Sequence, residues 1–392
     1  MVRVLLVNRF FGGSQTPTGR MLHDVAERLV AGGHDVVVLA SKRGYVKSEA
    51  GFSSSSPSRI DMRFIWQSSA VPRLVNWGWF WIQAIVRVPL MRWDRCLLLT
   101  DPPFLAVAAR LSKLLRRDSR KIFWWTMDLY PDALHAAGII DSDSVVYRAL
   151  QRCVESCLGS LDGAIALGPR QLDRLKAYRR WTSVGSHIVV APWDDRPLPK
   201  PPAGLNRVAK KFGWENVKVA LYAGNLGEGH PYAEFLDAAK WFQSRGRHDW
   251  VFVFVVRGSR VARLRIETAL LPNVRVMDYL PEADTACLLW SASVHLVSMK
   301  PGWEGIIVPS KLYGIFKTEA HVLFVGPEDA DTSEELRRLR LGKVLPWGCD
   351  GETVAAAMDE LERQPRNAPF ASAAGIARVA EYVVGGLRFT DW

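Results

Sequence analysis

Short apolar runs alternate with amphipathic segments along almost the whole chain, and this alternation constrains the fold more than any other feature of the sequence. The runs are rich in valine, leucine and isoleucine and predict buried strands, whereas the segments between them have helical periodicity. Such alternation is typical of βαβ units, in which helices cover both faces of a parallel sheet. The sequence therefore predicts an α/β protein built on parallel sheets.

The alternation occurs in two series. In the first half, strands are predicted at Val2–Asn8, Asp35–Ala40, Arg63–Trp66, Arg95–Thr100, Lys121–Met127, Gly163–Leu167 and His187–Ala191. In the second half, strands are predicted at Val217–Tyr222, Val251–Val256, Val274–Asp278, Val294–Ser298 and His321–Val325. Helices are predicted at Gly19–Ala31, Pro231–Ser244, Val261–Leu270, Ala283–Ser291 and Lys311–Phe316.

A proline-rich segment, residues 192–202, separates the two series. Such proline density continues neither a helix nor a central strand, so the segment is expected to be a linker. At ~100–200 residues per domain, a chain of 392 residues accommodates two domains. We expect Rossmann-like domains over residues 1–195 and 196–371 that face each other across a cleft, with a helix within 372–392 packing back on the first. Ligands of such sheets bind beyond the carboxyl ends of the strands.

The charge balance limits the possible partners. The chain has 51 Lys and Arg against 40 Asp and Glu, a net charge of +11, which suits a nucleic acid, a membrane surface or an anionic substrate. No nucleic-acid recognition motif is present and the basic residues are spread along the chain, so no nucleic-acid partner is expected. Hydrophobic residues make up 48% of the sequence, which excludes wholesale disorder.

Cysteine usage and the N-terminus concern location and metal binding. The five cysteines are scattered, and no second pair accompanies Cys153 and Cys157 to complete a zinc site, so we expect buried free thiols, a reducing compartment and no metal. The apolar run Val2–Asn8 is too short for a signal-peptide core. These features favour the cytoplasm.

The segment from Leu74 to Met91 is apolar but interrupted by polar residues and a proline, and it is too short to span a membrane. Two interpretations stay open. It is either a core helix of the first domain or a helix that lies in the membrane interface, peripheral to the membrane. The second interpretation would bury these aromatic and aliphatic side chains in lipid: Trp77, Trp79, Phe80, Trp81 and Ile85.

Three glycine-rich loops follow predicted strands. The first contains Gly12 and Gly13, the second spans residues 223–230, and the third spans residues 299–314 and ends in Ser310 and Lys311. Glycine lets backbone N–H groups approach an oxyanion, and a hydroxyl next to a lysine adds a donor and a cation, which together suit a diphosphate. Neither a dinucleotide-binding fingerprint nor a Walker lysine is present.

Several motifs carry a family resemblance that extends over nearly the whole chain. They are Gly32-Gly33-His34-Asp35-Val36, Asp128-Leu129-Tyr130-Pro131-Asp132, Leu221-Tyr222-Ala223-Gly224-Asn225-Leu226-Gly227 and Val308-Pro309-Ser310-Lys311-Leu312-Tyr313-Gly314. With these motifs the chain resembles bacterial glycosyltransferases of the GT-B fold, family 4. It is most similar to the branch that builds O-antigen, colanic acid and other exopolysaccharides.

The resemblance implies an activity. It implies a retaining, metal-independent transferase that moves a hexosyl or N-acetylhexosaminyl group from a nucleotide diphosphate donor, UDP-sugar above all, without a cofactor. The acceptor would be a glycan or a polyprenyl-diphosphate-linked sugar. An anionic membrane surface is a separate expected partner, because tryptophans and arginines are interleaved in the segment Arg73–Arg95. The alternative is a non-catalytic GT-B scaffold subunit that has lost turnover.

The resemblance also implies site residues. Gly12 and Gly13 would lie near the donor sugar and diphosphate, with Asn225 and Gly227 beside the phosphates. Ser310 and Lys311 would receive the β-phosphate, and Glu304 would lie near the donor sugar. Asp128 would orient or deprotonate the acceptor hydroxyl, which makes Asp128 and Lys311 the catalytic candidates. Further candidates around acceptor and donor are Thr18, His230 and Arg257.

Two segments depart from the family pattern. Arg257-Gly258-Ser259 and Lys317-Thr318-Glu319-Ala320-His321 are expected to bring bulk and charge to the nucleotide pocket. Arg257, Arg260 and Arg263 either supply phosphate-binding charge or form a solvated basic helix face. The second interpretation is slightly favoured.

Overall fold

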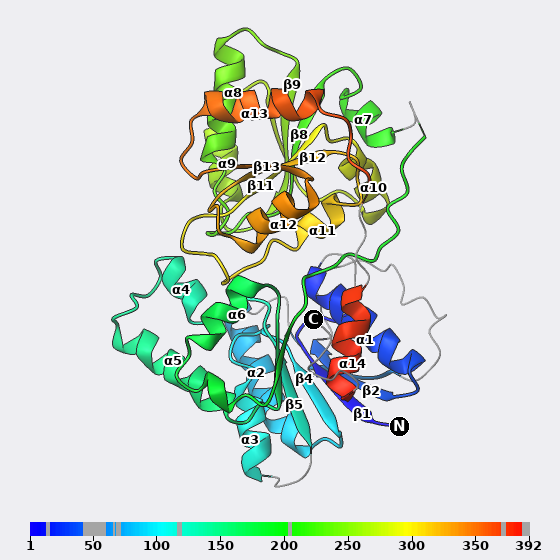
Figure 1. The fold of residues 1–392 in the computed structure, drawn as a ribbon, viewed down its shortest axis with the longest axis vertical. Coiled ribbons are helices and arrows are strands. Elements are labelled where there is room, and N and C mark those ends of the chain that lie inside the picture. The colour runs from blue at the N-terminus through cyan, green and yellow to red at the C-terminus, as the bar shows by residue number, and fades with distance from the viewer. Residues whose placement is uncertain are drawn as a thin grey trace. The chain divides into compact units, whose positions relative to one another are not determined.

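The computed structural model describes residues 1–12, 16–41, 60–65, 67, 72–115, 120–202, 206–369 and 374–385. These residues form two compact units (Figure 1). Unit 1 consists of residues 1–192 together with the last helix of the chain, and unit 2 is drawn from residues 193–372. Gly13, Trp66 and the serine-rich stretch at 53–58 lie outside the described residues.

Unit 1 is built on a seven-stranded parallel sheet in the order β3-β2-β1-β4-β5-β6-β7. Its strands are β1 (Arg3–Val7), β2 (Asp35–Ser41), β3 (Ile60–Ile65), β4 (Arg95–Leu98), β5 (Lys121–Trp125), β6 (Gly163–Ala166) and β7 (His187–Val189). The chain order reverses between β1 and β4, which is where ligands of such sheets bind. Each of the seven predicted strands is present, within a few residues of the predicted bounds.

Helices cover both faces of this sheet. They are α1 (Pro17–Ala31), α2 (Arg73–Leu90), α3 (Val107–Leu115), α4 (Asp132–Ala136), α5 (Val145–Leu158), α6 (Pro169–Lys176), the 3-10 turn η1 (Trp181–Ser183) and α14 (Ala374–Val384). Helices α1 and α14 pack side by side, as Figure 1 shows. Because crossover connections are right-handed, α2 and α3 lie on the opposite face from α1. They contact each other, and α3 also contacts α5.

Helix α2 contributes to the core of unit 1. Phe80, Ala84 and Val88 lie on one face of the helix and are fully buried, and the indole of Trp81 donates to the Phe104 carbonyl at 3.2 Å. The core-helix interpretation is therefore correct for this face of α2. None of the described helices combines the length and the apolar character that crossing a membrane requires.

Unit 2 repeats the same architecture with six parallel strands in the order β10-β9-β8-β11-β12-β13. The strands are β8 (Lys218–Asn225), β9 (Trp250–Arg257), β10 (Val274–Met277), β11 (Val294–Ser298), β12 (His321–Val325) and β13 (Gly342–Leu345). Five of them match the predicted strands, and β13 was not predicted. The predicted fold class, α/β with two parallel Rossmann-like sheets, is confirmed.

The helices of unit 2 are α7 (Arg207–Phe212), α8 (Ala233–Ser244), α9 (Val261–Glu267), α10 (Glu282–Trp290), α11 (Lys311–Ile315), α12 (Asp331–Leu339) and α13 (Gly351–Arg363). Helices α8 and α13 pack together against one face of the sheet (Figure 1). Large aromatic side chains fill the space beneath them, among them Tyr222, Phe235 and Phe254, all fully buried. The five cysteines of the chain are free, two of them buried and three half-buried.

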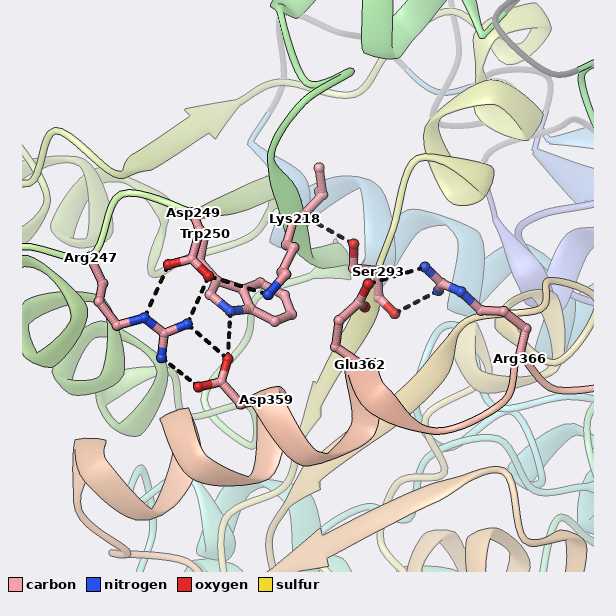
Figure 2. Close-up of polar contacts among 9 residues, drawn as sticks. Lys218, Arg247, Asp249, Trp250, Ser293, Asp359, Glu362 and Arg366 are labelled. Carbon is pink, nitrogen blue, oxygen red and sulfur yellow. Dashed lines mark hydrogen bonds and ion pairs between the residues drawn. The ribbon is translucent and has the colours of Figure 1, made fainter.

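A charged network fastens α13 to the amino ends of β8 and β9, the edge of the sheet opposite to the strand carboxyl ends (Figure 2). Asp359 of α13 accepts hydrogen bonds from the Arg247 guanidinium and from the Trp250 indole, the latter at 3.0 Å. Arg247 also pairs with Asp249 at 2.7 Å, and Lys218 joins the same carboxylate at 3.3 Å. The network therefore stabilises the fold of unit 2 at the edge of the sheet away from the glycine-rich loops.

Replacing Asp359 with alanine is expected to lower the free energy of unfolding by about 2–3 kcal/mol, because it leaves the half-buried Arg247 and the buried indole without this acceptor. Burial alone would raise the pKa of Asp359, but the hydrogen bonds from Arg247 and Trp250 outweigh it and lower the pKa. The stabilisation is thus present above the pKa of the unfolded chain and is lost as the pH falls through the folded pKa. Urea unfolding at several pH values measures both effects. Asp237→Ala, which removes a solvent-exposed pair with Lys240, is the matched control and should cost less than about 0.5 kcal/mol.

Candidate active site

The glycine-rich loops of unit 2 meet at the carboxyl edge of its sheet. Strands β8 and β11 are neighbours in the sheet, and the chain order reverses between them. Strand β8 ends at Asn225, the loop after it contains Gly227 and His230, and the loop after β11 leads to Ser310 and Lys311. The edge is therefore at the topological switch point, where open parallel sheets bind their ligands.

Lys311 is the central charge at this edge. Its ammonium lies 3.4 Å from the centroid of the Tyr222 ring, and the Nζ atom is buried without a hydrogen-bond partner among the described residues. Burial lowers the pKa of Lys311 well below its ordinary value. A buried ammonium without an acceptor is costly, and an anion beside it would remove that cost. The site is thus arranged to receive negative charge.

Gly224 makes room for this lysine. Its φ is +146°, and a Cβ added there would lie 3.1 Å from Cδ of Lys311. A side chain at this position would both strain the backbone and press on the lysine. The end of β8 therefore needs glycine so that Lys311 can lie across Tyr222.

The loops after β8 and β9 are fastened to each other. The backbone N–H of Leu226 donates to the Arg257 carbonyl at 2.6 Å. At Gly258, where φ is +134°, a Cβ would lie 2.3 Å from the Leu226 carbonyl oxygen and 3.0 Å from Oδ1 of Asn225. The Asn225 side chain is exposed, and Gly227 is half-buried beside it. Asn225 and Gly227 are thus held at the rim of the Lys311 site by backbone contacts that require Gly258.

His230 lies in the same loop and is neutral at pH 7. Burial and the nearby charge of Lys311 lower the pKa of His230 to about 4. Its Nδ1 is 3.0 Å from the Ser298 carbonyl, so Nδ1 carries the proton and Nε2 is left as an acceptor. His230 offers an acceptor for a hydroxyl group rather than a cation for a phosphate.

The three arginines after β9 have different environments. Arg257 stacks on Tyr279 at 4.0 Å, and Arg260 lies over Tyr232 at 4.8 Å. Arg263 is exposed and pairs with Glu267 at 2.7 Å. The solvated-face interpretation therefore fits Arg263, whereas ring contacts hold Arg257 and Arg260 beside the loop.

Glu304 and Ser310 lie in the long loop between β11 and α11. The Glu304 carboxylate accepts the backbone N–H of Gly302 at 2.9 and 3.0 Å, a contact within its own turn. Its neighbour Trp303 closes on Gly229, where a Cβ would lie 2.8 Å from the indole. Ser310 precedes α11, and its half-buried hydroxyl caps no N–H of that helix. These contacts define the loop's shape and connect it to the loop after β8.

The charges of residues 317–321 are paired within unit 2. Lys317 donates to the Arg196 carbonyl at 2.7 Å and lies 3.6 Å from Asp194, and Glu319 pairs with Lys200 at 2.6 Å. This segment therefore fastens α11 to the linker, and its lysine and glutamate are committed to that role.

In unit 1, an ion pair joins the loops after β1 and β4. Arg9 is 5% exposed and donates to the Asp101 carboxylate from Nε at 3.0 Å and from Nη2 at 3.2 Å. Its guanidinium also lies over the rings of Phe10, at 4.3 Å, and Trp77, at 5.2 Å. This pair fixes the two loops at the switch point of the first sheet.

Asp128 lies just beyond β5, at the carboxyl edge of the first sheet. The Thr100 hydroxyl accepts the backbone N–H of Asp128 at 3.2 Å. The side chain reaches solvent, yet the protein atoms around it and the negative charge of Asp101 raise the pKa of Asp128 to about 6. It borders a small pocket with Thr100, Phe104, Trp124, Tyr130 and Cys157. A carboxyl that titrates near neutral pH beside an aromatic pocket is suited to general acid–base chemistry.

The first glycine-rich loop is more closed than expected. Gly12, with φ at +63°, uses its backbone N–H to donate to the Gly19 carbonyl at 3.0 Å. Thr18 is half-buried in the first turn of α1. The N–H of Gly12 is thus committed to the loop itself, so any anion contact would have to come from other groups.

Three residues of these sites were not predicted: Tyr222, Asp101 and Arg9. Tyr222 is the last residue of the predicted strand Val217–Tyr222, next to the loop that was already singled out. Arg9 and Asp101 both follow predicted strands, and their pairing depends on β1 and β4 being neighbours. Among the described residues, no group of three or more His, Cys, Asp or Glu is placed to hold a metal ion.

Comparisons with known proteins give two distant relatives by sequence. The chain is 25% identical over 252 residues to the probable glycosyltransferase WbjE of Pseudomonas aeruginosa, a match that spans 61% of this chain and 60% of WbjE. It is 22% identical over 360 residues to WcaI of Escherichia coli K12, a provisionally named colanic acid biosynthesis glycosyl transferase, over 86% of this chain and 85% of WcaI. No model of a known protein family matches the chain.

Solved structures match over nearly the whole chain. WaaG, a glycosyltransferase involved in lipopolysaccharide biosynthesis, superposes with a TM-score of 0.68 over 98% of this chain and 100% of WaaG, at 14% identity. Anabaena HepE, solved in complex with UDP and glucose, gives a TM-score of 0.61 over 98% of this chain and 95% of HepE, at 13% identity. The chain thus has the GT-B fold, and the resemblance to family 4 glycosyltransferases that the sequence predicts is confirmed.

Proposed function

We propose that the protein is a retaining glycosyltransferase that uses a UDP-sugar to extend a glycan or a polyprenyl-diphosphate-linked acceptor in cell-surface polysaccharide biosynthesis. The relative WcaI, whose name places it in colanic acid biosynthesis, supports the polysaccharide context, and WbjE supports glycosyl transfer. HepE, a structural match with UDP and glucose bound, supports the nucleotide. The family resemblance supports retention of configuration and a metal-independent reaction.

The single observation that carries the proposal is the unpartnered ammonium of Lys311. It lies at the switch point of the second sheet, next to glycines that hold the backbone close. In this proposal the β-phosphate of the donor becomes the missing partner of Lys311, with the Ser310 hydroxyl and the Asn225 amide beside it. A fixed cation at a departing diphosphate stabilises the negative charge that develops in the transition state.

The transfer step uses unit 2 for the donor and unit 1 for the acceptor. The bond between the sugar C1 and the UDP oxygen breaks, and that electron pair leaves with UDP beside Lys311. The acceptor oxygen forms the new bond to C1 on the same face, and its proton passes to the Asp128 carboxylate or to the departing phosphate. Asp128 is suited to the first route because its raised pKa makes the carboxylate a stronger base.

Neutral groups near the donor would bind the sugar. The Nε2 atom of His230 can accept a hydroxyl hydrogen, since its Nδ1 is committed to Ser298. Glu304 lies in the loop that closes over Gly229, and its carboxylate is a second acceptor for sugar hydroxyls. Arg257, held on Tyr279, is placed beside the nucleotide in this proposal.

A non-catalytic scaffold loses support because the charges at Lys317 and Glu319 are paired with the linker rather than left in the nucleotide pocket.

A panel of nucleotide sugars tests the proposal directly. A UDP-sugar at 100 times its dissociation constant should stabilise the protein by ~2.7 kcal/mol, and GDP- and dTDP-sugars should stabilise it less. Thermal unfolding with each donor, followed by measurement of UDP release, separates binding from turnover. Failure of all three nucleotides to stabilise the protein contradicts the proposal. Binding without turnover on any acceptor would favour the scaffold instead.

A further inference from the structure

The outward face of helix α2 is apolar. Five side chains, spaced three or four residues apart, form one stripe along it and are each 47–65% exposed: Val75, Trp79, Ile82, Val86 and Leu90. The opposite face buries Phe80, Ala84 and Val88 in the core. A surface helix of a globular protein normally turns polar residues outward. Helix α2 differs, because it is apolar on its outward face as well as on its buried face.

The stripe extends onto the neighbouring helix. Leu114 and Leu115, at the end of α3, are 68% and 62% exposed, and α3 packs directly against α2. Scattered exposed apolar residues need no explanation, but an aligned set on one helix, with two more exposed leucines on the helix packed against it, marks a surface that binds something. We call these seven side chains the α2–α3 apolar face.

The sequence around this face is basic and contains few acidic residues. Between Asp61 and Asp94 there are four arginines, Arg63, Arg73, Arg87 and Arg92, and no acidic residue. Between Asp101 and Asp118 there are four more basic residues, Arg110, Lys113, Arg116 and Arg117, and again no acidic one. Arg87, Arg92 and Arg110 are exposed. From Met62 to Arg117 the acidic residues are Asp94 and Asp101, so the apolar face lies within a stretch of chain with a clear excess of positive charge.

We propose that the α2–α3 apolar face docks unit 1 onto an anionic lipid surface, with α2 lying in the plane of the interface. Apolar side chains would enter the boundary between headgroups and acyl chains, Trp79 would lie at headgroup depth, and the arginines would contact lipid phosphates. This is the interfacial-helix interpretation of the sequence, with a corrected set of contacts. Phe80 faces the core rather than lipid, and the stripe runs through Val75, Ile82, Val86 and Leu90 instead.

Charge favours an anionic lipid surface over a second copy of the chain. A second copy of the chain, packed symmetrically through the same face, would bring arginines against arginines, which costs free energy. An anionic bilayer instead supplies phosphates to every cation and an apolar layer to the stripe. The inference does not rest on donor binding in unit 2. The same helix also contacts the loop at the switch point of unit 1, because the Trp77 ring lies against Arg9 in the loop after β1.

Flotation of the full chain with vesicles tests the docking. Wild-type protein should float with phosphatidylcholine vesicles that contain about 30% phosphatidylglycerol, and binding should fall by about tenfold with pure phosphatidylcholine or in about 0.5 M NaCl. Ile82→Glu and Trp79→Glu each should weaken binding by about tenfold or more. Leu270→Glu, the same kind of change at a side chain of unit 2 that is 91% exposed, is the matched control and should bind as the wild type does.

Three outcomes overturn the inference. They are wild-type protein that stays in the soluble fraction with anionic vesicles at low salt, Ile82→Glu protein that floats as well as the wild type, and concentration-dependent self-association that Ile82→Glu abolishes in the absence of vesicle binding. The last would assign the face to a protein partner. A cooperative thermal unfolding transition, measured on each variant without ligand, confirms that the variants are folded, so flotation remains informative even if no nucleotide binds.

Discussion

Lys311→Met is expected to lower sugar transfer by about 10²–10³-fold while leaving the free protein as stable as the wild type or more stable. The two effects have one cause. The ammonium is buried over Tyr222 without a hydrogen-bond partner, so it opposes folding until an anion joins it. Methionine keeps the aliphatic chain that packs beside Gly224 and removes only the charge, so no large cavity opens.

Urea unfolding without donor and UDP release with donor measure the two effects separately. Lys300→Met is the control, since Lys300 lies in the same loop but has an exposed side chain, and it should change neither quantity by much. Turnover at wild-type rate in Lys311→Met would remove the central cation from the mechanism. A loss of stability of more than about 1 kcal/mol would show that the ammonium is satisfied in the free protein.

The same lysine should make the affinity for the donor depend on pH. Burial lowers the pKa of Lys311 in the free protein, and a bound diphosphate would raise it because opposite charge favours the protonated form. Binding therefore takes up a proton once the pH exceeds the pKa of the free protein, and affinity should decline as the pH rises further. Calorimetric titration in two buffers of different ionisation enthalpy detects that proton.

The fold follows from periodicity because strands and helices are local patterns. Each of the twelve predicted strands appears in the structure at nearly the predicted residues. Strand β13 was missed because Gly342–Leu345 is short, begins with glycine and carries a lysine, so it resembles a loop in isolation. It is a strand because its backbone pairs with β12, a long-range contact that local pattern does not report.

The candidate site could be predicted only in part, since it depends on which strands are neighbours. Loops at strand carboxyl ends were the right places to look, and Lys311 and Asp128 both lie there. The pairing of Arg9 with Asp101 requires β1 beside β4, and the contact of Lys311 with Tyr222 requires α11 to return over β8. Proximity also changes chemistry: burial and the nearby charge of Lys311 keep His230 neutral, which its place in the loop does not reveal.

Asp128→Asn is expected to lower transfer by about 10²–10⁴-fold, the range that a general base contributes. The amide keeps the shape of the side chain and the backbone contact to Thr100 but accepts no proton at neutral pH. Donor binding in unit 2 should be unchanged, so the thermal shift with UDP-sugar stays at the wild-type value. Asp143→Asn, an exposed carboxylate of the same unit, is the matched control.

The pH dependence of the transfer rate tests whether Asp128 is the group that accepts the proton. With a pKa of about 6, its carboxylate form is lost as the pH falls, so wild-type transfer should decline below about pH 6 and be level above it. Asp101→Asn removes the second cause of the raised pKa and should move this decline to lower pH. Stability changes with pH in the opposite direction to activity. Because folding raises the pKa of Asp128, the ionised carboxylate opposes folding above about pH 6. Asp128→Asn should therefore be more stable than the wild type at pH 8, and this difference in stability should narrow towards pH 4. Two results together would assign the proton transfer to a group other than Asp128. They are a decline in activity at low pH that Asp101→Asn does not move, and an unfolding free energy that Asp128→Asn does not change.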